Sequence, residues 1–335
     1  MKRQIPQKVV VLRAIPENGI AALQKKYRVD VNRSGHILTR AQLLRRVKNA
    51  SAIVSLLTDR IDDEVFVAAG DSLKIVANYA VGFDNIDLQA AERHGVVVSN
   101  TPGQLTESVA EHTMALLLAV ARRISEGDRY VRRGSYTQWE PMLLWGETLI
   151  GKTIGIIGGG RIGAAFATMC HNAFRMRVLY SDVAPCVQLE RFTGAKRVAL
   201  APLLRGSDVI SIHCPLLPST KHLIGSQQLA LIKPTAVLIN TARGPIVDER
   251  ALTAALSAKR IFGAGLDVFE FEPSLVPGLR QLENVVLTPH IGSATSGARE
   301  MMADMAAANV KAVLQGRAAP NPVTKYANPC RSLDN

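Results

Sequence analysis

Three charged side chains of different types, Arg243, Glu272 and His290, each follow a short run of apolar and β-branched residues. An arginine can bind a carboxylate through two parallel hydrogen bonds. A histidine can donate a proton to a carbonyl oxygen and take it back. A glutamate beside that histidine fixes its tautomer and favours its protonated form. Taken singly, each residue is more typical of a surface loop or a structural position than of a catalytic site. His94, His213 and His222 lack such charged neighbours, and His112 and His171 lie in helical patterns.

A glycine-rich turn, Gly158-Gly159-Gly160-Arg161-Ile162-Gly163, lies between an apolar run at 153–157 and a helical pattern at 164–171. Gly158 permits a tight turn, Gly160 lets the backbone approach a pyrophosphate, and Gly163 allows close packing of helix on strand. The helix N-terminus offers free N–H groups to an anion. In this strand–turn–helix context the motif predicts a dinucleotide site, whereas the glycines alone would be weak evidence.

An acidic residue, Asp182, follows the next strand pattern, 24 residues after Gly158. A carboxylate at about this spacing accepts hydrogen bonds from ribose hydroxyls and repels a 2′-phosphate. The next cation along the chain is Arg191. We therefore expect NAD in preference to NADP, the alternative being that Asp182 is only a turn residue.

The charged trio and the glycine turn suit one reaction, hydride transfer between a nicotinamide and a 2-oxo or 2-hydroxy acid. The cofactor supplies the hydride chemistry, and the protein supplies orientation and charge. Ligands of doubly wound sheets bind beyond the carboxyl ends of the strands, where the trio is expected. Asp267, assigned to a strand at 265–268, is expected to accept a hydrogen bond from the nicotinamide carboxamide.

The elements that must position these residues alternate between short β-branched runs and longer helical patterns, which predicts parallel α/β architecture. The pattern forms two series, with strands at 8–12, 28–31, 52–56, 75–78 and 96–99, and at 153–157, 177–180, 209–213, 236–240, 265–268 and 285–288. A helix at 107–123, capped by Thr106 or Ser108 and apolar nearly all round, is expected to join them and to be buried. A last helix at 298–314 is expected to return to the first domain.

Bulk properties fit a globular protein of two domains. The chain has 335 residues, of which 47% are hydrophobic and 20% are charged. A chain of this length usually has more than one hydrophobic core. Its net charge is +12, and residues 1–60 carry 13 Lys/Arg against 3 Asp/Glu. We expect this basic surface to be solvated or to steer a small anion toward a cleft. Binding of nucleic acid is not expected, because the chain has no recognisable nucleic-acid-binding motif. No apolar run is long enough for a membrane span, and the four cysteines lack metal spacing, so we expect a reduced cytoplasmic protein without a metal.

Over about residues 50 to 315 the chain resembles the D-isomer-specific 2-hydroxy-acid dehydrogenase family. The resemblance is carried by an ordered set of motifs at 81–87, 100–103, 151–163, 240–244, 267–273 and 288–293. It implies a Rossmann cofactor domain at 105–293 inserted in a smaller flavodoxin-like substrate domain at 1–104 and 294–325, with an irregular tail at 326–335. Gly159 departs from the family, which often has a larger apolar residue there.

The resemblance also implies roles for individual residues. Arg243, Glu272 and His290 would be the catalytic trio, with His290 the acid/base, in a cleft between the domains. Backbone amides around Val81 and Gly82 would hold the substrate carboxylate together with Arg243. The residues implied to contact the cofactor are Thr106, Arg161, Ile162, Asp182, Cys214, Pro215, Thr241, Ala242, Asp267, His290, Gly292 and Ser293.

Within the family, the stretch at 133–141 and Gly146 are similar to glyoxylate and hydroxypyruvate reductases. An alternative is that the chain is a relative of the 2-ketogluconate reductases or of the phosphite dehydrogenases. Phosphite dehydrogenases, however, have a lysine where this chain has Val81. A second alternative is a nucleotide-sensing corepressor, because corepressors that resemble this family can have the same three charged residues. The resemblance implies a homodimer, with Trp139 and Trp145 in the contact; the alternative is that these two side chains pack within the chain. The charge pattern and the lack of a long apolar run predict neither nucleic acid nor membrane as partner.

Overall fold

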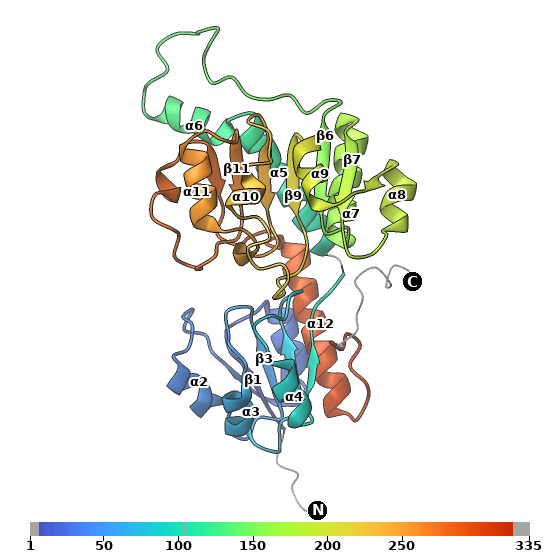
Figure 1. Ribbon diagram of the computed structural model, residues 1–335. Coiled ribbons are helices and arrows are strands. Elements are labelled where there is room, and N and C mark those ends of the chain that lie inside the picture. The colour runs from blue at the N-terminus through green and yellow to red at the C-terminus, as the bar shows by residue number, and fades with distance from the viewer. Residues whose placement is uncertain (1–6, 104, 324–335) are drawn as a thin grey trace, which may run out of the picture. The chain divides into compact units, whose positions relative to one another are not determined.

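The computed structural model describes residues 7–103 and 105–323, which form two compact units (Figure 1). One unit comprises the described residues of Met1–Leu105 and Ala294–Ala327, and the other those of Thr106–Ser293. Each unit has its own parallel sheet, so the predicted fold class is confirmed. No helix within the described ranges is long and apolar enough to cross a membrane. The tail predicted at 326–335 lies outside the described residues.

The first unit contains a five-stranded parallel sheet with the order β2-β1-β3-β4-β5, the flavodoxin-like order expected from the sequence. Side chains of successive residues point to opposite faces of a strand, and both faces are buried here. Val9 and Val11 pack with α1 and α12, whereas Val10 and Leu12 pack with α2, α3 and α4. The strands are β1 (Lys8–Val11), β2 (Arg28–Val31), β3 (Ala52–Ser55), β4 (Ile75–Asn78) and β5 (Val97–Ser99), and the helices are α1 (Glu17–Gln24), α2 (Arg40–Val47), α3 (Asp63–Ala69), α4 (Leu88–Arg93) and α12 (Ser296–Leu314).

The second unit contains a seven-stranded parallel sheet with the order β12-β11-β10-β9-β6-β7-β8. Counted from its first strand, β6, the order reverses between β6 and β9, as in a Rossmann fold. Ligands of such sheets bind at the carboxyl ends of the strands beside this reversal. The strands are β6 (Thr153–Ile157), β7 (Arg177–Ser181), β8 (Lys196–Arg197), β9 (Val209–Ile212), β10 (Val237–Asn240), β11 (Gly263–Leu266) and β12 (Val285–Leu287).

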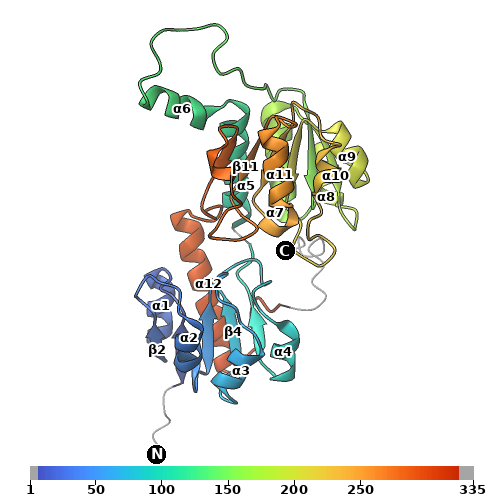
Figure 2. The ribbon, with the colours of Figure 1, turned by 60° about the vertical axis from the view of Figure 1, so that its left-hand side comes forward.

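Helices cover both faces of this second sheet (Figure 2). α5 and α7 bury their apolar side chains against one face, and α9, α10 and α11 against the other. α6 follows α5 after a break at Arg123, whose φ of 52° is left-handed. The helices are α5 (Leu105–Ala121), α6 (Ile124–Arg132), α7 (Arg161–Phe174), α8 (Val187–Thr193), α9 (Leu200–Gly206), α10 (Ser226–Leu229) and α11 (Glu249–Ser257), with short 3₁₀ turns at Gly244–Ile246 and Leu279–Gln281.

Some predicted boundaries are wrong, and close packing explains the shift of β11. β11 begins at Gly263 and ends at Leu266, so Asp267 follows the strand instead of lying in it. A Cβ on Gly263 would lie 2.8 Å from a side-chain carbon of Val120, so this strand uses glycine where α5 approaches. Glycine lowers strand propensity, which hid the start of β11 from sequence analysis.

Two further differences from the predicted elements concern the start of α5 and the short strand β8. α5 begins at Leu105, so Thr106 and Ser108 lie in its first turn and neither is the cap. β8 consists of only Lys196 and Arg197 and was not predicted, because two charged residues carry no strand pattern.

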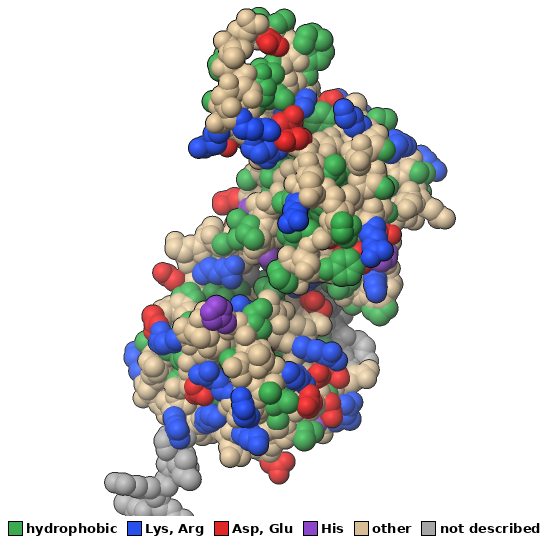
Figure 3. Space-filling model, turned by 90° about the vertical axis from the view of Figure 1, so that its left-hand side faces the viewer, with side chains coloured by type: hydrophobic (Ala, Val, Ile, Leu, Met, Phe, Trp, Pro, Cys, Tyr) green, Lys and Arg blue, Asp and Glu red, His purple; other side chains and the backbone are tan. Residues whose placement is uncertain are grey.

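The basic side chains of the first unit lie on its surface among acidic ones (Figure 3). Arg33 pairs with Glu17 at 2.5 Å and Arg46 with Asp30 at 2.5 Å. These pairs are exposed or half-exposed, so solvent screens them and they add little to stability. Their arrangement fits the interpretation of a solvated basic surface.

The packing of α1 on α12 generates a stability prediction. A Cβ on Gly19 would lie 2.7 Å from the carbonyl oxygen of Ala303, closer than real Cβ contacts allow. We expect Gly19→Ala to lower the free energy of unfolding by about 1–3 kcal/mol, because the helices must separate. Gly127→Ala in α6 is the matched control, since its Cβ would meet only Leu144 at 3.8 Å. Urea unfolding of both variants measures this, and a Gly19→Ala protein as stable as wild type would contradict the packing.

Candidate functional site

The glycine turn after β6 has the geometry of a phosphate-binding loop. Gly158 has a φ of +95°, and a Cβ there would lie 2.5 Å from the backbone nitrogen of Cys214. A Cβ on Gly163 would lie 2.2 Å from the carbonyl oxygen of Gly158, so this glycine permits α7 to pack closely. A Cβ on Gly160 would meet nothing within 4 Å, which leaves the side of the turn open to a ligand. The loop therefore fits a dinucleotide pyrophosphate at the N-terminus of α7.

The departure at Gly159 also has a structural reason. A Cβ at Gly159 would lie 3.1 Å from the Cβ of Cys186 and 3.4 Å from Tyr180. The Cys186 thiol donates a hydrogen bond to the carbonyl oxygen of Gly159 at 2.8 Å. The space that a larger residue would need is thus taken by these two side chains.

Asp182, the residue after β7, faces the glycine turn. Its Oδ2 accepts a hydrogen bond from the Gly159 amide at 2.7 Å, and its Oδ1 accepts one from the Ala184 amide at 3.3 Å. A carboxylate has about four acceptor positions, so the side chain can still accept hydrogen bonds from ribose hydroxyls. The fold also brings Arg197 here, where its guanidinium donates to the carbonyl oxygens of Asp182 and Val183 at 2.9 and 2.8 Å. This cation was not expected near Asp182, because it belongs to the unpredicted strand β8.

His290 and Glu272 form a hydrogen-bonded pair beyond the carboxyl ends of β11 and β12. His290 Nδ1 lies 3.1 Å from Glu272 Oε2, and both side chains are about one-quarter to one-third exposed, at 26% and 31%. Burial would raise the pKa of Glu272, but the hydrogen bond and charge of His290, the Phe269 amide and the charge of Arg243 together lower it. The geometry leaves His290 Nε2 as the ring nitrogen that is not held by Glu272.

The buried carboxylate of Asp267 anchors the loop that carries His290. Its Oδ1 accepts the Ile291 amide at 2.8 Å and the Thr288 hydroxyl at 2.7 Å, and its Oδ2 accepts the Gly292 amide at 2.8 Å. Asp267 is 1% exposed. Burial would raise its pKa, but the interactions with His112, Thr288 and the two amides lower it. Its predicted contact with the nicotinamide stays a prediction.

His112 is a member of this network that sequence analysis passed over. Its Nε2 lies 3.0 Å from Thr288 Oγ1 and 3.3 Å from Asp267 Oδ1. Ser108, from the same helix α5, donates to the carbonyl oxygen of Gly292 at 3.0 Å. Polar residues within an otherwise apolar helix were the available signal. α5 therefore supports the His290 loop as well as the core.

Arg243 lies in the turn after β10, which packs against the start of the Glu272 loop. A Cβ on Gly244 would lie 1.9 Å from the carbonyl carbon of Phe269, so the two turns touch through backbone. Asn240, at the end of β10, accepts the Ala242 amide at 3.0 Å and donates to the Arg243 carbonyl at 3.0 Å. The structure thus brings Arg243, Glu272 and His290 to one edge of the sheet.

The other predicted cofactor residues of the second unit occupy the same edge. Thr241 Oγ1 lies 3.0 Å from Thr113 Oγ1 of α5. Cys214 follows β9 beside Gly158, and burial raises the pKa of its thiol to about 11, so the thiol is neutral at physiological pH. His213 beside it is half-buried, and desolvation lowers its pKa to about 3, so its ring is neutral; its Nε2 lies 2.8 Å from the Ser211 hydroxyl.

In the first unit, Val81 and Gly82 lie in the turn after β4. The buried Asn78 donates to the Gly82 carbonyl oxygen at 2.8 Å, and Asn100 donates to the Val81 carbonyl oxygen at 2.7 Å. Ser55 in turn donates to Asn78 at 2.9 Å. This amide network sets the conformation of the turn. Asn78 was not among the predicted site residues, although a polar residue at the end of an apolar strand was a usable signal.

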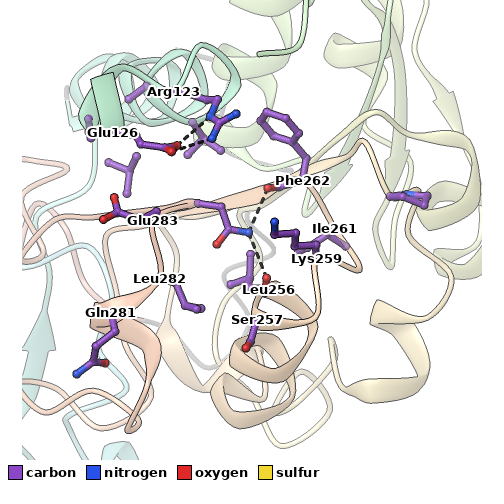
Figure 4. Close-up of a pocket in the computed structure, with 16 residues that line it drawn as sticks. Arg123, Glu126, Leu256, Ser257, Lys259, Ile261, Phe262, Gln281, Leu282 and Glu283 are labelled. Atoms are coloured by element: carbon purple, nitrogen blue, oxygen red, sulfur yellow. Dashed lines mark hydrogen bonds and ion pairs between the residues drawn. The ribbon is translucent and has the colours of Figure 1, made fainter. Parts of the chain in front are cut away.

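A cavity of about 530 Å³ lies elsewhere in the second unit, beside the C-terminal end of α5 (Figure 4). Val120, Phe262 and Val286 are among the apolar residues that line it. Two charged groups at the cavity, Arg123 and Glu126, form a hydrogen-bonded pair at 2.7 Å. None of the predicted site residues lines this cavity.

Comparisons with known proteins identify the family of this chain. Residues 114–292 match the family model of the NAD-binding domain of D-isomer specific 2-hydroxyacid dehydrogenases. A glyoxylate reductase of Pyrococcus furiosus is 47% identical over 322 residues, which cover 95% of each chain.

Two solved structures are similar over nearly their whole length. The glyoxylate reductase from Paecilomyes thermophila has a TM-score of 0.84 and 30% identity, covering 96% of this chain and 99% of that one. An NADPH-dependent glyoxylate/hydroxypyruvate reductase from Sinorhizobium meliloti, in complex with NADP and malonate, has a TM-score of 0.83 and 31% identity, covering 95% and 97%. The chain therefore belongs to the D-isomer specific 2-hydroxyacid dehydrogenases, and it is an oxidoreductase that acts with a nicotinamide cofactor on 2-hydroxy or 2-oxo acids.

Proposed function

We propose that the protein interconverts small 2-oxo and 2-hydroxy acids, with glyoxylate and hydroxypyruvate as the first candidates. The observation that carries the proposal is the pair His290–Glu272, 3.1 Å apart, beside Arg243 at the carboxyl ends of the strands. The names of the relatives, glyoxylate reductase and glyoxylate/hydroxypyruvate reductase, support the substrate class.

Each member of the trio has a distinct role in the proposal. Arg243 binds the substrate carboxylate, and His290 donates a proton from Nε2 to the carbonyl oxygen during reduction. Glu272 holds His290 in the tautomer and charge state that can donate. The amides of Val81 and Gly82 are proposed to bind the same carboxylate. A bound nicotinamide would supply the hydride.

We expect His290→Ala to lower kcat for NADH-dependent reduction of glyoxylate or hydroxypyruvate by about 100- to 10,000-fold, since no group replaces the proton donor. His36→Ala, at an exposed position of the first unit, serves as the control. The absorbance of NADH measures turnover. Undiminished turnover in the His290 variant would refute the role of His290. A wild-type protein that quenches NADH fluorescence without consuming NADH would point to the corepressor class instead.

For the cofactor, we propose binding by the glycine turn, with NAD preferred over NADP. Gly158, Gly160, Arg161, Ile162 and Gly163 would hold the pyrophosphate. The other proposed contacts are Thr106, Asp182, Cys214, Pro215, Thr241, Ala242, Asp267, Gly292 and Ser293. The Asp182 carboxylate favours a free ribose hydroxyl, whereas the nearby Arg197 cation reduces its repulsion of a 2′-phosphate.

This opposition of charges is testable. We expect Asp182→Ala to raise kcat/KM for NADPH relative to NADH by about 10-fold or more, because a like charge near the phosphate is removed. Arg197→Ala should change the same ratio in the opposite direction. Steady-state kinetics with both cofactors measure the ratio. A wild-type preference for NADPH would overturn the proposed cofactor choice.

The proposed oligomer is a homodimer that uses α6 and the segment after it. Trp139 is 76%, Met142 68% and Trp145 61% exposed, and Ile124 and Val131 of α6 are also exposed. Hydrophobic side chains are visible on this segment, at the top of Figure 3. Contiguous exposed apolar residues of this size mark an interaction surface. The domain boundaries given above and a cytoplasmic location stay predictions.

We expect wild type to sediment as a dimer and the double variant Trp139→Ala, Trp145→Ala to have a dissociation constant raised by at least about 100-fold, as for two central aromatic contacts. Val67→Ala, which also removes an exposed apolar side chain (63%), is the control on α3. Sedimentation velocity over a range of concentrations measures the change. A monomeric wild type would exclude the dimer.

A further inference from the structure

A buried carboxylate, Glu249, lies behind the loop that carries Glu272. It is 3% exposed. Its Oε2 accepts the amide of Glu270 at 2.6 Å, and its Oε1 accepts the amide of Val276 at 2.8 Å. These amides lie on either side of Glu272 in the sequence, so one side chain holds both ends of its loop.

The contact between α11 and this loop is reciprocal. The backbone amide of Glu249 donates to Glu270 Oε2 at 3.2 Å. The other oxygen of Glu270 lies 2.7 Å from His222 Nε2, so the turn after β9 joins the same network. Within the loop, the Ser274 amide donates to the Phe271 carbonyl at 2.8 Å, which closes a turn around Glu272.

Helix capping does not account for the buried position of Glu249. Asp248 is the N-cap of α11, and its side chain accepts the Ala251 amide. An acidic residue in a first turn normally interacts with the helix dipole from an exposed position. The Glu249 carboxylate is instead desolvated, which is costly unless hydrogen bonds compensate, and its bonds to the Glu270 and Val276 amides both go to the Glu272 loop.

We propose that Glu249 is a positioning residue for the reaction: by holding the amides of Glu270 and Val276 it sets the Glu272 carboxylate against His290. The inference rests on the proposed roles of Glu272 and His290. The Phe269 amide, next to the anchored Glu270, donates to Glu272 Oε1 at 3.0 Å. Movement of the loop would therefore weaken two interactions of Glu272 together.

The charged groups that face Glu272 give the proposal a pH signature. They are His290 and Arg243, and with the Phe269 amide they lower the pKa of Glu272 against the effect of burial. A loosened loop weakens these interactions, so the pKa of Glu272 rises. Glu272 must be ionised to hold His290. When its pKa is raised, activity is therefore lost at a higher pH, and the acid limb of the pH profile of kcat moves to higher pH.

The test compares Glu249→Gln with wild type in the full-length protein. Glutamine keeps the size of the side chain, but its NH2 group would face one of the two backbone N–H groups. That hydrogen bond is lost, because both groups are donors. We expect kcat to fall roughly 10-fold, as for loss of a hydrogen bond to a charged group, with KM nearly unchanged and the acid limb at higher pH. Asp208→Asn is the matched control, since Asp208 also accepts a backbone amide, that of Thr153 at 2.9 Å, but lies at the amino ends of the strands. It should lose stability without altering kcat or the acid limb.

A double-mutant cycle decides whether Glu249 acts through Glu272. In a Glu272→Gln background, Glu249→Gln should cause little further loss of kcat, because interacting residues are not additive. A further 10-fold loss there, or a Glu249→Gln enzyme with wild-type kcat and acid limb, would overturn the proposal. If Glu249→Gln does not fold, Glu249→Asp, whose shorter side chain cannot span both amides, takes its place. Full activity of Glu272→Gln alone would instead refute the proposed function of the pair.

Discussion

Both parallel sheets are covered by helices on their two faces, and this burial decides where polar chemistry can occur. Val9 and Val11 pack on one side of β1 while Val10 and Leu12 pack on the other, and the strands of the second sheet are buried in the same way. A parallel sheet of this kind leaves its strand ends as the places where side chains can meet a ligand. The glycine turn, Arg243 and His290 all lie at these ends.

The turns at the strand ends cannot complete their backbone hydrogen bonds with sheet or helix partners. Carboxylates supply several of the missing acceptors: Asp182 binds the amide of Gly159, Asp267 those of Ile291 and Gly292, and Glu249 those of Glu270 and Val276. Removing one such acceptor leaves a buried donor unsatisfied, at a cost of about 1–3 kcal/mol. Each acceptor thereby fixes a turn that carries a residue of the site.

The same carboxylates shape the electrostatics of the site. The low pKa of Asp267 keeps it charged in a buried place, where it can hold the loop of His290. Glu272 is ionised because His290, Arg243 and the Phe269 amide offset its burial. Beside the glycine turn, the positive charge of Arg197 lies close to the negative charge of Asp182, because its guanidinium donates to the Asp182 carbonyl oxygen.

Local sequence determined much of this protein. Alternating apolar runs predicted the two parallel sheets, and the glycine spacing with Asp182 predicted the cofactor turn. The motif order around Arg243, Glu272 and His290 pointed to the family, because these signals are local in the chain or follow strands whose ends must converge. The predicted boundaries of β11 and α5 were wrong, and at β11 the reason is the packing of Gly263 against Val120, which is distant in sequence.

Only the tertiary structure decided which polar residues support the site. Arg197 lies 15 residues from Asp182, His112 is 155 residues from Asp267, and Glu249 is 27 residues from Val276, and nothing local marks any of these pairs. Their partners are backbone atoms and carboxylates brought together by the strand order. A hydrogen bond depends on distance and direction in space, which spacing along the chain does not specify.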